Sequence, residues 1–308
     1  MFIVKNRKIF YTLSLVLVIA SIVAVSTWGL VLGIDFKGGS LMEFTYANGR
    51  PDISEVKANL DRVNTDQSIQ GYLLRSYGTD GYSLKTPAMS SSTSLAVQSV
   101  LSIGDKKAEL KKLNSIGPVV GAEAAKKSII SIILVLLAII LFISFAFRKV
   151  SEPVSSWKYG LFAIVALLHD VFIPVGAFAV LGHFLGYEVD TLFVTAMLVV
   201  LGFSVHDTIV VYDRVRENLK LNRLNKVSKH FVEIVGDSIK QTIVRSINTS
   251  LAVLLSVVAL YFFGPESTKN FSLVLIIGIF FGTYSSIFIA SNLLVTADKI
   301  STKKGKLK

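Results

Sequence analysis

Six apolar stretches, each about 20 residues long or longer, dominate this sequence of 308 residues. An α-helix rises about 1.5 Å per residue, so roughly 20 residues cross the ~30 Å hydrocarbon core of a membrane. The predicted spans are residues 9–32, 128–147, 159–181, 191–212, 242–263 and 271–295. The sequence therefore predicts a polytopic α-helical membrane protein with six transmembrane helices.

The composition agrees with a membrane location and excludes several other classes of protein. Hydrophobic residues make up 52% of the chain and charged residues only 17%, whereas an ordinary soluble domain has about 25% charged residues. Such a chain is not disordered, not a coiled coil and not an ordinary cytosolic enzyme. Its net charge of +11 is more typical of basic cytoplasmic loops than of a nucleic-acid surface. Cysteine is absent, which excludes disulfides and thiolate metal sites.

The distribution of Lys and Arg predicts the orientation, because the cytoplasmic loops of membrane proteins are enriched in both. With the N-terminus inside, 19 of these residues fall in cytoplasmic segments, whereas the short outer loops 182–190 and 264–270 contain only Lys269. Both termini are therefore expected in the cytoplasm. The first span also resembles a cleaved signal peptide, but its apolar run is long and continues past the loose cleavage site at 24–26, which favours an uncleaved span.

One long segment, residues 33–125, is expected outside the cytoplasm, and it contains ten Lys or Arg and ten Asp or Glu. Its pattern predicts secondary structure in an order typical of a small α/β ferredoxin-like domain. The predicted strands are 40–46, 68–76 and 82–85, and the predicted helices are 51–63 and 95–113, the second interrupted near Gly104. No cluster of His, Asp and Glu in the segment resembles a hydrolytic or metal site, so a docking domain is favoured over an enzyme.

These boundaries divide the chain into four parts. The parts are 1–32 (cytoplasmic N-terminus and first helix), 33–125 (outer α/β domain), 126–297 (helices two to six, with a basic cytoplasmic loop at 213–241) and 298–308 (basic cytoplasmic tail). The membrane part is the larger, so the chemistry is sought among its few charged residues.

Ionisable residues within spans are costly in a bilayer and usually functional. Three sites stand out: His169 with Asp170 in the third span, His206 with Asp207 in the fourth, and Arg245 in the fifth. Asp207 and Arg245 are similarly far from the connection between their antiparallel helices, which predicts a pair at one depth. A carboxylate placed between an arginine and apolar surroundings can gain and lose a proton. The alternative is a buried ion pair of fixed charge that serves folding specificity.

The third-span pair is expected to be structural. Asp170, beside His169, can simply bond a neighbouring helix. A metal site shared with His206 and Asp207 is disfavoured, because adjacent residues face different sides of a helix and the sequence has no H-E-x-x-H motif.

Small and hydroxyl residues follow two further patterns in the last two spans. Thr249 and Ser250 come one turn after Arg245 and are expected to line the same polar seam. Small residues recur at every fourth position of the sixth span and predict a ridge for close helix packing. The ridge consists of Gly278, Gly282 and Ser286.

Four motifs, in order along the chain, carry a family resemblance. They are GIDFKGG at 33–39 (Gly33, Asp35, Gly38 and Gly39), IGPVVGAE at 116–123 (Gly117, Pro118, Gly121 and Glu123), LHDV at 168–171 and GFSVHDTIVVYDRVREN at 202–218. With Arg245, Thr249, Ser250 and the six-span layout, they resemble the SecD/SecF family of protein-export membrane proteins. That family belongs to the resistance-nodulation-division superfamily, and the layout resembles its separate SecF subunit.

The resemblance implies a subunit of the bacterial cytoplasmic (inner) membrane that works with a SecD-like partner and the SecYEG channel. It implies that the proton-motive force promotes export of unfolded polypeptides, with Asp207 and Arg245 as the proton-coupling residues and without cofactor, metal or enzymatic reaction. His206 departs from the pattern, because many members are expected to have Asn there. Nucleic acid is not an expected partner.

Two alternatives remain on the sequence alone. One is a half-size lipid or drug exporter of the same superfamily, although the outer domain is small for an exporter and co-purification with a SecD-like partner would argue against it. The other is a non-transporting membrane assembly scaffold or a hydrolase. A scaffold predicts that Asp207 and Arg245 tolerate neutral replacement as a pair, and a hydrolase needs a nucleophile or metal constellation that the sequence does not show.

Overall fold

The structure is a computed structural model that describes residues 2–64, 69–147, 154–226 and 229–305. The chain forms two units, a helical unit (Met1–Val31 with Ile130–Lys308) and an outer unit (Leu32–Ile129). Some residues used above lie outside the described ranges: Ser68 of a predicted strand, the basic residues Arg148 and Lys149, and residues 306–308 of the tail.

The described part of the chain contains six helical segments that are long and apolar enough to cross a membrane, as the sequence predicts. Their helices are α2 (Arg7–Trp28), α6 (Pro118–Ala146), α7 (Ser156–Leu185), α8 (Thr191–Leu224), α9 (Phe231–Phe263) and, forming the last span together, η1 (Glu266–Thr268), α10 (Lys269–Ser285), the π-helical η2 (Ser286–Ala290) and α11 (Ser291–Gly305). A four-residue helix, α1 (Phe2–Lys5), precedes them.

The helices differ in how much of their surface the chain itself covers. About half of the apolar windows of α7, α8 and the last span is buried, whereas α2, α6 and α9 are mostly exposed. Large apolar side chains such as Leu141 and Phe145 of α6 and Phe262 of α9 are at least 66% exposed. Exposed apolar surface on this scale needs lipid or a protein partner to cover it.

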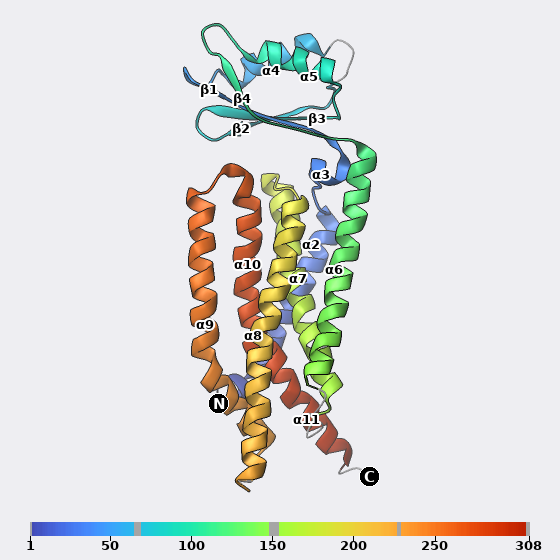
Figure 1. The fold of residues 1–308 in the computed structure, drawn as a ribbon, viewed down its shortest axis with the longest axis vertical. Helices are drawn as coiled ribbons and strands as arrows, with labels where there is room; N and C mark the ends of the chain where they lie inside the picture. Colours follow the sequence, from blue (N-terminus) through green and yellow to red (C-terminus); the bar gives the residue numbers. More distant parts are fainter. Residues whose placement is uncertain (1, 65–68, 148–153, 227–228, 306–308) are drawn as a thin grey trace. The chain divides into compact units, whose positions relative to one another are not determined.

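Helices α8 and α10 pack most closely and run side by side through the helical unit (Figure 1). The glycines of the predicted ridge lie at this contact: a Cβ on Gly278 would be 2.3 Å from Val200 Cγ2, and one on Gly282 would be 3.0 Å from Ser204 Cβ. Real Cβ atoms essentially never come as close as 2.3 Å, and 3.0 Å is tighter than nine in ten real Cβ contacts, so the missing side chains allow the two backbones to meet.

The predicted basic loop 213–241 is mostly helical. Helix α8 continues to Leu224, and α9 begins at Phe231 after a capping box in which the backbone N–H of His230 donates to Glu233 Oε2 at 3.3 Å. Ion pairs along the α8 extension, such as Arg216 with Asp213, stabilise helical backbone that is too polar for a bilayer. The helices are therefore longer than the apolar runs from which the spans are predicted.

The outer unit is a four-stranded antiparallel sheet with two longer helices. Its elements are α3 (Ile34–Lys37), β1 (Gly39–Tyr46), α4 (Ile53–Val63), β2 (Leu73–Tyr77), β3 (Gly81–Thr86), α5 (Ser91–Leu101) and β4 (Ala108–Ile116), and the strand order is β2-β3-β1-β4. Helices α4 and α5 cover one face of the sheet (Figure 1). Their apolar residues Val56, Leu60 and Leu101 are buried with Met42 and Phe44 of β1.

The predicted helix 95–113 is wrong in its second half, which is the edge strand β4. A left-handed turn at Gly104 (φ +57°) follows α5 and ends helical continuation. Leu110 and Leu113 are spaced like residues on one helical face, but they lie opposite Phe44 and Met42 of β1. A register shift in this pairing adds one residue to β4, so a spacing of two became a spacing of three.

The carboxylate of Asp52 caps α4 and should make the helix sensitive to acid. Its Oδ1 accepts the Ser54 N–H at 2.8 Å and the Ser54 hydroxyl at 2.6 Å, and these bonds lower the pKa of Asp52. Because the folded-state pKa lies below the unfolded value of about 3.9, the cap stabilises α4 above that value and is lost as pH falls through the folded pKa. We expect the hydrogen-exchange protection factors of α4 to fall on acidification, and less so in Asp52→Asn. An equal fall in both proteins would contradict this role.

Candidate functional site

Asp207 lies on α8 and is buried, with 2% of its surface exposed. Its Oδ2 is 3.3 Å from the hydroxyl of Ser250 on α9. Ser250 is in turn 2.6 Å from the hydroxyl of Thr283 on α10. A polar seam therefore joins α8, α9 and α10 at the depth of Asp207, and it includes Ser250, as the sequence predicts for the residues after Arg245.

Arg245 does not lie against Asp207. Its side chain is exposed, and within the described ranges no ion pair joins it to Asp207. The residue of α9 that faces Asp207 is Ser250, five residues further on, which is about 7.5 Å along the helix and on a different face. The predicted contact within this chain is therefore wrong. Counting from the charged connection misplaced the register, because that connection is itself helical almost throughout.

His206 faces away from the bundle. Its side chain is 71% exposed, and its Nδ1 is 3.9 Å from Asp207 Oδ1. Arg245 and Thr249 are also exposed on α9, where the Thr249 hydroxyl donates within its own helix to the carbonyl oxygens of Arg245 and Ser246. We call His206, Arg245 and Thr249 the exposed polar strip. Charged and polar side chains on the outside of a membrane bundle are costly against lipid.

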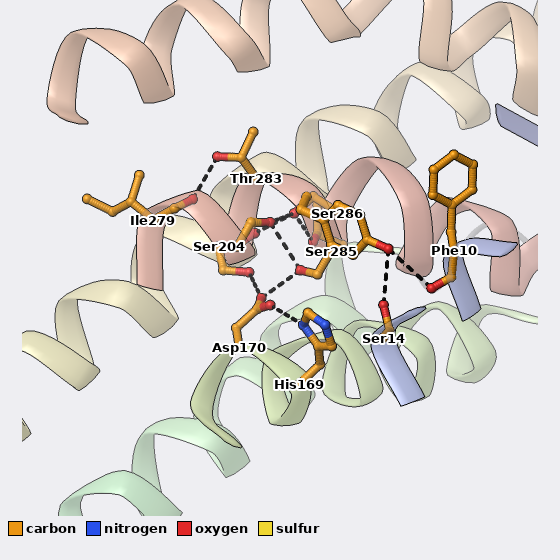
Figure 2. Close-up of polar contacts among 12 residues, drawn as sticks. Phe10, Ser14, His169, Asp170, Ser204, Ile279, Thr283, Ser285 and Ser286 are labelled. Carbon is orange, nitrogen blue, oxygen red and sulfur yellow. Dashed lines mark hydrogen bonds and ion pairs between the residues drawn. The ribbon is translucent and has the colours of Figure 1, made fainter. Parts of the chain in front are cut away.

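Asp170 is the more completely enclosed carboxylate, with no exposed surface. Its Oδ2 accepts hydrogen bonds from Ser204 of α8 at 2.5 Å and Ser285 of α10 at 2.7 Å. Its Oδ1 lies 2.8 Å from Nδ1 of the neighbouring His169 (Figure 2). This aspartate therefore ties α7 to both central helices, as the sequence analysis expects, and a histidine completes its surroundings.

His169 is also buried, with 5% of its side chain exposed. Its ring stacks on Tyr284 of α10 with centroids 6.0 Å apart and an interplanar angle of 25°. Tyr284 in turn donates its hydroxyl hydrogen to the Phe10 carbonyl of α2 at 3.1 Å and lies 3.3 Å from the Ser14 hydroxyl (Figure 2). Within the described residues, the second ring nitrogen of His169, Nε2, has no hydrogen-bond partner.

One short run of α10 connects both carboxylates. Thr283 contacts Ser250, the partner of Asp207, whereas Ser285 donates to Asp170. The next residue, Ser286, lies 2.9 Å from the Thr208 hydroxyl of α8 and begins the π-helical turn η2. The sequence patterns do not single out Ser204, Ser285, Thr283 or Thr208. Each of these hydroxyl residues lies within a few positions of an intramembrane charge or of a glycine of the ridge. That proximity was the signal in the sequence that could have identified them.

The two motifs at 33–39 and 116–123 meet in the outer unit. Gly38 has φ +76°, and a Cβ on it would be 2.8 Å from the Pro118 Cα. A Cβ on Gly121 would be 2.8 Å from the Gly38 backbone nitrogen. Gly39, with φ +136°, leaves no room before the Thr86 carbonyl oxygen, at 2.8 Å. The motif glycines thus let two backbone segments, 80 residues apart in sequence, lie in direct contact.

The remaining motif residues have simpler surroundings. Gly33 precedes α3 as its N-cap, Asp35 lies in the first turn of α3, and a Cβ on Gly117 would meet nothing within 4 Å. Glu123 pairs with Lys127 of α6 at 2.8 Å. Across the described residues, no three His, Cys, Asp or Glu side chains are grouped as metal ligands.

Comparison with known proteins gives the same family throughout. Residues 96–299 match the family model described as protein export membrane protein SecD/SecF, C-terminal, and residues 24–49 match the SecD/SecF GG motif. The chain is 43% identical to a protein translocase subunit SecF of Thermobaculum terrenum over 96% of this chain and 93% of that protein. It is 35% identical to the SecF subunit of Anaerolinea thermophila over 95% and 92% of the two chains.

A solved structure also matches. SecDF from Thermus thermophilus, described as a translocon-associated membrane protein, superposes with a TM-score of 0.79 at 29% identity, covering 96% of this chain. The present chain spans only 38% of that SecDF chain. The six spans, the meeting of the two glycine motifs and the matches over nearly the whole length lead to one conclusion: this chain belongs to the SecD/SecF family of protein export membrane proteins.

Proposed function

We propose that this chain acts as the SecF-type subunit of a Sec protein translocase and uses the proton-motive force, together with a SecD-like partner, to promote export of unfolded polypeptides through a SecYEG channel. The relatives from Thermobaculum terrenum, Anaerolinea thermophila and Haemophilus influenzae, which the chain matches over 82–93% of their length, are named as SecF translocase subunits, a role in transport rather than catalysis. A half-size lipid or drug exporter and a non-transporting scaffold are not favoured by these relatives.

The observation that carries the proposal is the position of Asp207. It is buried at a seam of hydroxyl groups, and its Oδ1 lies 3.9 Å from Nδ1 of the exposed His206. The carboxylate is therefore adjacent to an exposed polar side chain, which is costly against lipid. Reversible protonation at such a site is the usual role of an acidic residue within a transporter span.

The exposed polar strip supports a partner on this side of α8 and α9. The chain corresponds to 38% of the solved SecDF chain, so the family arrangement has further SecD-type helices available to cover it. We infer that the partner brings Arg245 under the influence of Asp207 or of an equivalent carboxylate. A proton that neutralises the carboxylate removes the counter-charge of the arginine, and the α8–α9 contact then repacks.

Topology and the outer unit complete the proposal. The excess of basic residues supports a chain with both termini in the cytoplasm, in the bacterial inner membrane, and with 33–125 outside. The element order β-α-β-β-α-β and the strand order β2-β3-β1-β4 support a ferredoxin-like domain. We infer that this domain is the part that contacts the emerging polypeptide.

The test is Asp207→Asn in inverted membrane vesicles that contain the partner subunits and carry an imposed proton gradient. We expect the gradient-dependent part of translocation to fall at least about tenfold, because Asn has nearly the same shape but binds no proton in this range. Asp213→Asn is the matched control: it lies on the same helix in an exposed ion pair with Arg216 and should leave translocation unchanged. Normal gradient dependence of Asp207→Asn, at a normal protein level, would overturn the proposal.

A further inference from the structure

The buried pair His169 and Asp170 can bind one more proton than the hydrogen bond between the two side chains requires. Asp170 Oδ2 already accepts two hydroxyl hydrogens, from Ser204 and Ser285, so its proton exchange with the histidine concerns Oδ1 alone. On the other side of the ring, Nε2 is buried with no partner among the described residues. A purely structural histidine normally uses both ring nitrogens when it is buried.

The two charge states of the pair differ by one proton, and both fit this geometry. In the first, His169 is neutral with its hydrogen on Nδ1, which donates to ionised Asp170, and Nε2 is bare. In the second, one proton has been added at Nε2. The Nδ1 hydrogen then either stays on the ring, which leaves an imidazolium cation beside a carboxylate, or passes to Oδ1, which gives a neutral imidazole and a carboxylic acid. The added proton is the only atom gained, no bond other than N–H or O–H changes, and Oδ2 keeps both serine bonds.

We propose that His169 and Asp170 form a second proton-binding site in this subunit, which takes up one proton at His169 Nε2, separate from any proton bound at Asp207. The site is a dyad with net charge −1 when empty and 0 when occupied. The inference rests on the proposed function only for the use to which that proton is put, because proton binding itself can be measured without export.

No cationic side chain in the described ranges pairs with the dyad, so its charge is balanced by hydroxyl and ring dipoles. Helix α10 contributes Tyr284, stacked on His169, and Ser285; helix α8 contributes Ser204; and helix α2 contributes Ser14 through Tyr284. Another carboxylate of α8, Asp207, comes three residues and so nearly one helical turn after Ser204, the donor to Asp170. An aspartate so placed makes each proton site sensitive to the charge of the other.

Helix α10 is the element that senses the charge of the dyad. Ser285 donates to Asp170, and two residues earlier Thr283 contacts Ser250, the partner of Asp207. Directly after Ser285 the backbone adopts the π-helical turn η2. Turns of this kind are rare and are often found at functional sites. Ionised Asp170 holds the Ser285 hydroxyl more strongly than the acid does, so occupation of the dyad loosens α10 at the start of η2.

The experiment is nuclear magnetic resonance of the full chain in lipid, with ¹⁵N-labelled histidine. The chain has only four histidines, and His169→Gln identifies the signals of His169. We expect the Nε2 signal of His169 to move from a bare to a protonated nitrogen as the pH is lowered from about 8.5 to about 5. A single protonation pattern over the whole range in which the chain stays folded would overturn the proposal.

Two variants test whether the aspartate is part of the site. In Asp170→Asn, the amide donates to Nδ1 and fixes the histidine hydrogen on Nε2, so the pH-dependent change should disappear. Ser272→Ala removes another fully buried serine of α10, one whose hydroxyl donates to the carbonyl oxygen of Thr268 at the start of the same span, and should leave the titration unchanged. An unaltered His169 titration in Asp170→Asn would show that the dyad does not act as one site.

The Asp207→Asn chain separates this inference from the proposed function. His169 should still titrate there, with a shifted midpoint, even though gradient-dependent export is lost. Export that persists in Asp207→Asn while His169 titrates would overturn the proposed function and would support the proposed dyad site. Loss of export in Asp207→Asn with a His169 that never titrates would support the proposed function and overturn the proposed dyad site.

Discussion

Gly278→Ala should destabilise the helical unit even though alanine is the better helix former. The new Cβ would lie 2.3 Å from Val200 Cγ2 and 3.0 Å from Val200 Cβ, so α8 and α10 must move apart. Valine cannot turn aside, because its branched side chain has one strongly preferred rotamer in a helix. Overpacking of this kind costs about 1–3 kcal/mol, and the gain of about 1 kcal/mol from replacing glycine in a helix offsets only part of it.

The measurement is unfolding of the full chain in mixed micelles, with denaturing detergent as the titrant and helix content as the signal. Gly202→Ala is the matched control: it lies on α8, and its Cβ would meet nothing within 4 Å. It should be neutral or slightly stabilising. A double variant, Gly278→Ala with Val200→Ala, removes both Cγ atoms, leaves only the 3.0 Å contact with the Val200 Cβ, and should recover part of the loss. Equal stability of Gly278→Ala and Gly202→Ala would show that the α8–α10 contact does not depend on this glycine.

The same packing supports the candidate proton sites. Gly282 lies against Ser204, and Ser204 donates to Asp170, so the distance between α8 and α10 sets the geometry of the carboxylate. The His169 nitrogen signals of Gly278→Ala should therefore change along with its stability. The small-residue ridge is thus part of the site's construction as well as of the fold.

The sequence predicts the membrane part well because length and hydropathy are local properties. Six apolar runs are enough to identify six spans, but they do not show where each helix ends. Helix α8 continues past its apolar run to Leu224 because exposed ion pairs and helix formers can extend a helix into water. In the outer unit, the register shift opposite Glu43 and Phe44 made strand β4 resemble a helix. These errors come from tertiary pairing, which periodicity alone does not contain.

The sequence predicts the charged residues of the candidate site but not the residues that they contact. Asp170 and Asp207 stand out in any apolar span, whereas their partners are ordinary serines 34 to 115 residues away in sequence. Nothing local distinguishes Ser285 from the neighbouring Ser286. Asp207 contacts Ser250 rather than Arg245 because of the register between α8 and α9. Every few residues of helix in the connection between α8 and α9 shift that register by a full helical turn.

Gly38→Ala should damage the outer unit strongly. Two costs add at this position. Gly38 has φ +76° and ψ 165°, a region that only glycine adopts readily and that costs another residue about 1–3 kcal/mol. Its Cβ would also lie 2.8 Å from the backbone of Pro118, which cannot rotate away as a flexible side chain could. The segment that leads into β1 must then separate from the start of α6, and the β1–β4 pairing next to it weakens.

Two further glycines separate these costs. Gly49 has φ +82° but open space around its Cβ, so Gly49→Ala should show the backbone cost alone. Gly117 has neither positive φ nor a close neighbour, so Gly117→Ala should be neutral. Hydrogen-exchange protection of β1 and β4 in the full chain should therefore fall most in Gly38→Ala, less in Gly49→Ala and not in Gly117→Ala. If Gly38→Ala and Gly49→Ala lost equal protection, the glycines of the motif would serve only the turn. The larger loss in Gly38→Ala would show that they are needed for the contact between the two motifs, which explains why one chain carries both.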